Sequence, residues 1–261
     1  MRSKDDFAFE REIYSIAYGF RLQPEHAGLY EDPVTNKPRQ FDIRCHATIK
    51  TQRIALAIEC KRLNPTYPLL ASCVPRATNE AQHQILHTDA VMGNGASFTR
   101  VQTVAGGRYP LLYPPREGVC KSMQQARREV KGERRGEMVG GDEVFDKWMQ
   151  ALASMADLIE RGAEALSVRR EDGVTQMAFL PVLAVPDGTL WVANYSTQGD
   201  LREEPFQAEE ITFFLGRKYS LTREKLTFAI AHLHVMTRTA VGNFLQNIAD
   251  GGGIWQQLFQ S

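Results

Sequence analysis

Two neighbouring stretches decide the fold: Phe41-Asp42-Ile43-Arg44-Cys45-His46-Ala47-Thr48-Ile49 and Ile54-Ala55-Leu56-Ala57-Ile58-Glu59-Cys60-Lys61. In the first stretch apolar and polar residues alternate strictly, which is typical of a strand with one buried face. In the second, an apolar run of strand length is followed abruptly by charged residues. We therefore predict an antiparallel β-hairpin that turns at Lys50 and Thr51.

The register of this hairpin follows from the turn. Apolar residues then oppose one another in three pairs: Ile43 and Ile58, Cys45 and Leu56, and Ala47 and Ile54. On the other face Asp42 falls opposite Glu59, and Lys61 shares that face with Glu59 because side chains alternate. Directly opposed Cβ atoms lie about 4.5–5.5 Å apart. Two carboxylates and an ammonium group are thus expected to converge at one end of the hairpin.

The composition is that of a packed globular protein. The chain has 261 residues, of which 43% are hydrophobic and 24% charged, which argues against a disordered or fibrous chain. We expect a single domain over residues 1–261. Lys and Arg together number 31, as do Asp and Glu, so a surface that binds a polyanion must be local.

The start of the chain and its cysteines bear on location. No apolar run is long enough to span a membrane, and Met1 leads into charged residues and not into a signal peptide. We therefore expect a cytoplasmic protein with no membrane partner. The four cysteines form no C-x-x-C pair, which favours reduced thiols over a zinc site or a disulfide framework.

The rest of the pattern predicts an α/β fold. Apolar residues at helical spacing predict helices over residues 5–20, 121–131, 142–166 and 237–248. Further strands are expected over residues 177–185, 189–195 and 225–236. Residues 64–118 hold six of the twelve prolines, so we expect a loop-rich insertion around one short helix near residues 80–87. Interleaved helices and strands imply a mixed central sheet flanked by helices.

The converging charges suggest metal-dependent hydrolysis. Two close carboxylates repel each other unless a cation joins them, and carboxylate oxygens suit Mg²⁺ or Mn²⁺. Such an ion can polarise a phosphoryl oxygen and activate a water, while the Lys61 ammonium stabilises charge. Glu10 lies towards the core-facing side of the first helix, where a carboxylate needs a partner.

These residues resemble the PD-(D/E)XK, or restriction-endonuclease-like, nuclease superfamily. The likeness is carried, within Phe9–Lys61, by Phe9-Glu10 and the closing Gly19-Phe20 of the first helix, by Arg39-Gln40-Phe41-Asp42-Ile43 and by Ile58-Glu59-Cys60-Lys61. Phe41 stands where the family usually has proline. The resemblance implies a restriction-endonuclease-like mixed sheet and an Mg²⁺-dependent endonuclease that hydrolyses DNA, with Mn²⁺ as a substitute, in defence or DNA processing.

The resemblance also implies a role for individual residues. Asp42 and Glu59 would be metal ligands together with the backbone carbonyl of Cys60, Lys61 would position or activate the attacking water, and Glu10 would be an auxiliary acid. Family members often add a glutamine or basic residues on the following helix. DNA contacts are therefore expected in and beside residues 121–131, from Ser122, Gln125 or its neighbour Gln124, Arg127, Arg128 and Lys131. Cutting of both strands would suggest a homodimer.

Other interpretations stay open. The charged residues could form a surface ion pair on an ordinary hairpin, or the chain could be a catalytically silent nuclease fold that binds nucleic acid or protein. A hydrolase acting on RNA or on a small phosphorylated molecule would use the same metal. The insertion could instead sense a ligand in a regulated effector nuclease, or build a dimer. His232 and His234 share a strand face and are expected to be a packed or an exposed strand pair and not to bind a metal.

Overall fold

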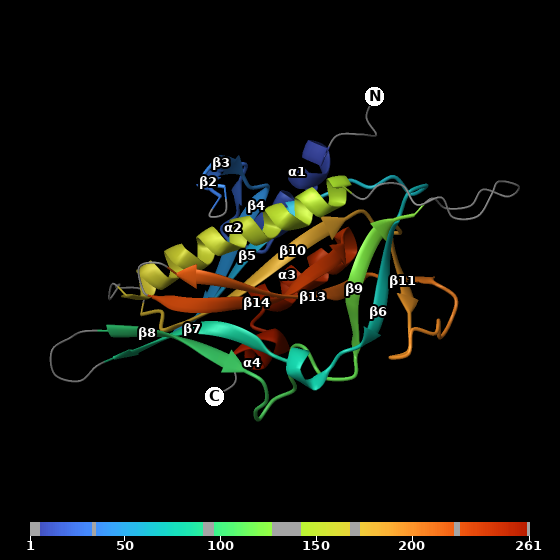
Figure 1. The fold of residues 1–261 in the computed structure, drawn as a ribbon. Coiled ribbons are helices and arrows are strands. Elements are labelled where there is room, and N and C mark those ends of the chain that lie inside the picture. The colour runs from blue at the N-terminus through green and yellow to red at the C-terminus, as the bar shows by residue number, and fades with distance from the viewer. Residues whose placement is uncertain are drawn as a thin grey trace, which may run out of the picture.

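The chain forms a layered α/β structure around one mixed sheet (Figure 1). The structure is a computed structural model and describes residues 6–32, 35–90, 97–126, 142–167, 173–221 and 225–259. The helices are α1 (Asp6–Gly19), α2 (Asp142–Ser167), α3 (Arg238–Ala249) and α4 (Gly253–Leu258), with a short 3-10 turn, η1 (Thr78–Glu80). The predicted α/β class, with a mixed sheet flanked by helices, is confirmed.

Twelve strands of the described residues make up the main sheet. Ten follow the order β1-β4-β5-β10-β14-β13-β9-β6-β11-β12, and the β7–β8 hairpin joins it through β10. The strands are β1 (Glu25–His26), β4 (Ile43–Ile49), β5 (Gln52–Cys60), β6 (Leu69–Pro75), β7 (His83–Ala90), β8 (Ser97–Val104), β9 (Gly118–Gln125), β10 (Gln176–Val185), β11 (Leu190–Asn194), β12 (Phe206–Gln207), β13 (Glu210–Leu221) and β14 (Leu226–Thr237). A separate small hairpin pairs β2 (Leu29–Glu31) with β3 (Pro38–Gln40).

The predicted hairpin is confirmed in its register. β4 and β5 are antiparallel, with Ile43 opposite Ile58 and Cys45 opposite Leu56. The other edge of β5 pairs with β10 in parallel, from Gln52 to Cys60. β5 is therefore an interior strand with both faces covered, which explains why its sequence is a continuous apolar run.

Helices cover both faces of the sheet. On one face Ile43 belongs to a buried cluster with Ile13 of α1 and Leu245 of α3. On the other face Ala57 of β5 clusters with Ile159 of α2. Figure 1 shows α2 crossing one side of the sheet and α3 lying on the side away from it. Within the described ranges, no helix has the length and apolar character needed to cross a membrane.

The prediction of a loop-rich insertion over residues 64–118 is wrong. This segment supplies β6, β7 and β8, and the short helix expected near residues 80–87 is replaced by η1 and the start of β7. The prolines suggested loops, but two of them stand at the ends of a strand: Pro68 directly precedes β6, and Pro75 is its last residue. Proline is tolerated at a strand end, where it costs no ladder hydrogen bond.

The helix predicted over residues 121–131 is also wrong in the part that the structure describes. Residues up to Gln125 belong to β9, which pairs antiparallel with β6 along most of its length. Lys121 to Gln125 are adequate helix formers, but pairing with a neighbouring strand overrides this weak preference. Arg127, Arg128 and Lys131 lie outside the described residues.

The C-terminal half matches its prediction more closely. Helix α2 and strands β10, β11 and β14 form where they were expected. Thr237 caps α3, because its hydroxyl oxygen accepts a hydrogen bond from the amide of Ala240 at 3.4 Å. His232 and His234 are buried on β14, which selects the packed alternative over the exposed one.

Candidate functional site

The two predicted metal ligands lie together at the end of the β4–β5 hairpin. The Cys60 amide donates a hydrogen bond to Asp42 Oδ2 at 2.8 Å, and the Asp42 amide donates to Glu59 Oε1 at 3.3 Å. Asp42 is 6% exposed and Glu59 is fully buried. The hairpin register therefore holds two carboxyl groups side by side in a place with little access to water.

The cation at these carboxylates is Lys147 of α2, which the sequence analysis did not single out. Its Nζ lies 3.1 and 2.9 Å from the two carboxylate oxygens of Asp42 and 3.6 Å from Glu59 Oε2. The sequence did hold a signal. Lys147 stands one helical turn before Ala151 and two before Ser154, both buried, so a lysine interrupts the core-facing stripe of the helix.

Burial shifts the pKa values of the side chains in this cluster. Desolvation, reinforced by the neighbouring Asp42, raises the pKa of Glu59 well above its usual value, although Lys147 acts in the opposite direction. Burial disfavours the charge of Lys147, but Asp42 and Glu59 outweigh it and raise the pKa of this ammonium group. The cluster is an ammonium group shared by two carboxyls, one of which is costly to ionise.

Glu10 borders the cluster from α1, as predicted. Its Oε2 lies 3.3 Å from Nε2 of His26, the last residue of β1. Partial burial, followed by the charge of Asp42, raises the pKa of Glu10. A carboxyl group with a raised pKa holds its proton more readily than usual, which suits it to proton transfer.

Lys61 directly follows Cys60, the last residue of β5. Its Nζ lies 3.3 Å from Asp6 Oδ2 at the start of α1, and its amide donates to the carbonyl of Ala184 in β10. The other Asp6 oxygen accepts a hydrogen bond from the Arg62 amide at 2.8 Å. The Cys60 side chain is buried in the apolar cluster on the opposite face, as the register requires.

The donor set fits a hard cation that keeps some of its water. Glu59 Oε2 is buried and accepts no hydrogen bond, so it has lone pairs to offer to a cation. Mg²⁺ is commonly held by one or two carboxylates and retains several waters. In the described part of the chain, no group of three or more His, Cys, Asp and Glu side chains forms a ready metal cage. The protein would supply Asp42, Glu59 and the Cys60 carbonyl.

Two predicted DNA-contacting residues lie elsewhere. Ser122 and Gln125 belong to β9, which is separated from β5 by β10, β14 and β13 in the sheet. Gln125 Nε2 donates to the carbonyl of Tyr67 at 3.3 Å. The fold does not place these two side chains on a helix that follows the carboxylate strand.

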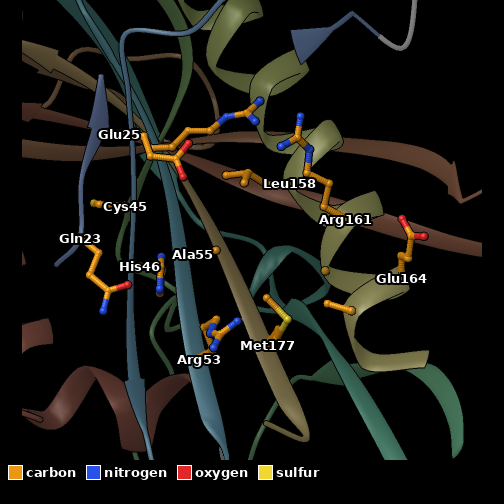
Figure 2. A pocket seen from close by; sticks show the side chains of 13 residues that line it. Gln23, Glu25, Cys45, His46, Arg53, Ala55, Leu158, Arg161, Glu164 and Met177 are labelled. Atoms are coloured by element: carbon orange, nitrogen blue, oxygen red, sulfur yellow. The ribbon is translucent and has the colours of Figure 1, made fainter. Parts of the chain in front are cut away.

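A pocket of about 400 Å³ opens further along the sheet face that α2 covers. Figure 2 shows His46 and Arg53 on the strands facing Leu158 and Arg161 of α2. Arg44 closes the side towards Asp42, since its guanidinium binds Asp157 Oδ2 and Ser154 Oγ. The pocket lies towards the opposite ends of β5 and α2 from Glu59 and Lys147, and its lining carries both basic and acidic groups, among them Arg53, Arg161, Glu25 and Glu164.

Comparisons with known protein families, with curated proteins and with solved structures found no match for this chain.

Proposed function

We propose that this protein is a divalent-metal-dependent phosphodiesterase that hydrolyses DNA, built on a restriction-endonuclease-like arrangement. The observation that carries the proposal is the position of Asp42 and Glu59. Both are buried, and backbone amides orient one carboxyl against the other at a strand end. Proteins rarely bury two adjacent carboxyl groups without a role for a cation there.

Each residue around this pair has its own part in the proposed reaction. Mg²⁺ or Mn²⁺ bound there would polarise a phosphoryl oxygen and make a bound water more acidic. Glu10, with its raised pKa, accepts the proton of the attacking water. Lys61, restrained by Asp6, orients that water and offsets the negative charge that develops on the phosphate.

Lys147 has a second role in this scheme. Its ammonium neutralises Asp42 and Glu59 while no metal is bound. A divalent ion at the same oxygens would repel it, so Lys147 would move towards the phosphate. An ammonium in that position stabilises the charge of the transition state.

The pocket under α2 offers a path for the substrate along the sheet. The Arg161 side chain is 59% exposed, although its Nε lies 3.0 Å from Asp157 Oδ2, and Arg53 lies across the pocket from it (Figure 2). Guanidinium groups bind phosphates through paired hydrogen bonds. We assign these two residues to the DNA backbone away from the scissile phosphate, because they lie towards the opposite ends of β5 and α2 from Glu59 and Lys147.

The strongest rival is a catalytically silent binding subunit, and one observation favours it. Lys147 contacts both oxygens of Asp42, and a permanent internal cation would leave no place for a metal. The two accounts differ in whether a divalent ion can displace this ammonium.

Cleavage of supercoiled plasmid and short linear DNA in Mg²⁺, Mn²⁺ or EDTA tests the proposal. The variants are Asp42→Asn, Lys61→Ala and Glu10→Gln, with Glu12→Gln as the matched control, because Glu12 lies on the same helix but pairs with Arg238 at the surface. We expect metal-dependent nicking that Asp42→Asn lowers roughly 1,000-fold, equivalent to about 4 kcal/mol. Glu12→Gln should cleave as the wild type does.

Two outcomes would contradict the proposal. One is a wild type that cleaves neither DNA nor RNA in any metal. The other is cleavage that Asp42→Asn leaves unchanged, which would identify a co-purified nuclease. Cleavage of RNA alone would keep the chemistry and change the substrate.

A further inference from the structure

A second cavity, of about 410 Å³, lies away from the carboxylate cluster. It is bounded by the residues after β6, the starts of β9 and β13, the end of β14, and helices α3 and α4. Its apolar lining includes Met236 and Ile254 of the cluster that packs under α3 and α4, whereas Asp42 and Glu59 face α2. The two sites therefore lie on opposite faces of the sheet.

The floor of this cavity holds a buried positive charge. Arg76 is 4% exposed. Its Nη1 donates to the carbonyl of Pro114 at 2.7 Å and its Nη2 to Thr212 Oγ1 at 2.6 Å, both uncharged acceptors. Its Nε is buried and has no hydrogen-bond partner. Among the described residues no carboxylate forms an ion pair with it, although a buried guanidinium normally requires one.

Burial lowers the pKa of Arg76, and the charges of Glu117 and Glu80 act in the opposite direction without forming an ion pair with it. Tyr113 Oη and His234 Nε2 share a hydrogen bond of 2.8 Å, and the Tyr113 ring stacks on that of His232 with their centroids 3.8 Å apart. Burial, followed by the charge of Arg76, lowers the pKa of His232 to about 2 and that of His234 to about 4. Both histidines are therefore neutral at physiological pH.

Exposure changes from the floor to the mouth of the cavity. Arg76, His234, Met236 and Ile254 are buried. Glu117, Glu210, Asn247 and Gly253 are exposed at the rim. A guest that reaches Arg76 must cross a rim with two carboxyl groups, which disfavours multiply charged molecules such as polyphosphates. The volume lies within the range of small-molecule sites in proteins, about 300–1,000 Å³.

We propose that this cavity binds a small organic anion, in which a single carboxylate or phosphate group pairs with Arg76 and an apolar body lies against Met236 and Phe244. The guanidinium has N–H donors left for such a group, and a charge-assisted bond in a place with little water is stronger than one at the surface. The site does not depend on the nuclease proposal, because it shares no residue with the carboxylate cluster.

The test uses three simple probes that share one ring: benzoate, phenyl phosphate and the uncharged benzamide. Each is titrated into ¹⁵N-labelled full-length protein, and binding is followed by amide chemical shifts. We expect at least one anion to bind in the millimolar range, with shifts at Gly118, Thr212 and Gly253, and benzamide to bind about tenfold more weakly or less. The anion that binds identifies the group that Arg76 prefers.

Two variants locate the site. Arg76→Gln removes the charge and should weaken anion binding about tenfold or more. Gly253→Leu keeps Arg76 and adds a side chain at the exposed rim of the cavity; a Cβ at Gly253 would meet no atom within 4 Å, so the variant should unfold at the wild-type temperature and weaken binding by narrowing the mouth. The assignment is overturned if neither anion binds at tens of millimolar, if benzamide binds as tightly, or if Gly253→Leu binds as the wild type does.

Discussion

The carboxylate cluster and the Arg76 cavity both bury charge, but they balance it differently. Asp42 and Glu59 share the ammonium of Lys147 within 3.6 Å. Arg76 is held by a carbonyl and a hydroxyl, with no carboxylate paired to it among the described residues. The first site is neutralised from within the chain, whereas the second depends on neutral groups or on a guest.

This difference separates two ways of preparing a site for a charged ligand. In the cluster a divalent ion must displace an internal cation, so binding is an exchange of one cation for another. In the cavity an anion adds a counter-charge that the protein lacks. Removing the protein's own charge should therefore damage the first site severely and the second only slightly.

The largest effect is expected for Lys147→Met. The variant leaves Asp42 and Glu59 buried together with no cation, which should cost about 2–4 kcal/mol of unfolding free energy in EDTA. Saturating Mg²⁺ should recover most of this loss, since it replaces the missing charge. Urea denaturation with and without Mg²⁺ measures both quantities.

Arg238→Met is the control for that experiment. It also removes a cation from an ion pair, but Arg238 and Glu12 are each about half exposed, so the cost should be below about 1 kcal/mol. An equal loss in the two variants, or no recovery with Mg²⁺ in Lys147→Met, would show that Lys147 does not occupy a metal position.

A smaller effect of opposite sign is expected for Glu59→Gln. Burial raises the pKa of Glu59 from its ordinary value of 4.5. Above pH 4.5 the folded protein therefore holds a proton that the unfolded chain releases. Stability without metal therefore falls as pH rises from that value to the raised pKa. Glu59→Gln removes this penalty and should stabilise the metal-free protein by about 1 kcal/mol at pH 8. The same variant should lose its stabilisation by Mg²⁺.

The raised pKa of Glu59 also makes metal binding depend on pH. A carboxyl group must lose its proton before it binds a cation. Mg²⁺ affinity measured by calorimetry should rise with pH below that pKa, by at most about tenfold per pH unit for one proton, and level off above it. A pH-independent affinity would exclude Glu59 as a ligand.

The smallest effect is expected for Arg76→Met. Two hydrogen bonds to neutral acceptors are lost, but so is the cost of burying an unpaired guanidinium, and no opposite charge is left without a partner. The unfolding free energy should change by about 1 kcal/mol or less. A loss as large as that of Lys147→Met would mean that Arg76 has a structural counter-charge.

The hairpin and its carboxylates could be predicted from the sequence because the information is local. Alternation and the two-residue turn fix which residues oppose one another, and these place Asp42 beside Glu59. Glu10 followed from helical spacing on α1. Lys147 could not be placed in the same way, since its contact joins residues 105 positions apart in the chain. The sequence showed only that α2 has a lysine on its buried stripe.

The β6–β9 region was misread for the same reason. The prediction over residues 64–118 relied on prolines as loop signals, and the prediction over residues 121–131 relied on helix preference. Both segments become strands through pairing with each other and with β10, β11 and β13. Arg76 was missed because its neighbours Tyr113, Thr212 and His234 converge on it only in the folded sheet.

The most direct test of the carboxylate cluster is a crystal structure of the protein soaked in Mn²⁺, with anomalous scattering to locate the ion. We predict a peak about 2.0–2.2 Å from oxygens of Asp42 and Glu59, with Lys147 Nζ moved away from both. An Asp42→Asn crystal should lack the peak. A wild-type crystal in which Lys147 keeps its bonds to Asp42, with no ion between the two carboxylates, would contradict the account.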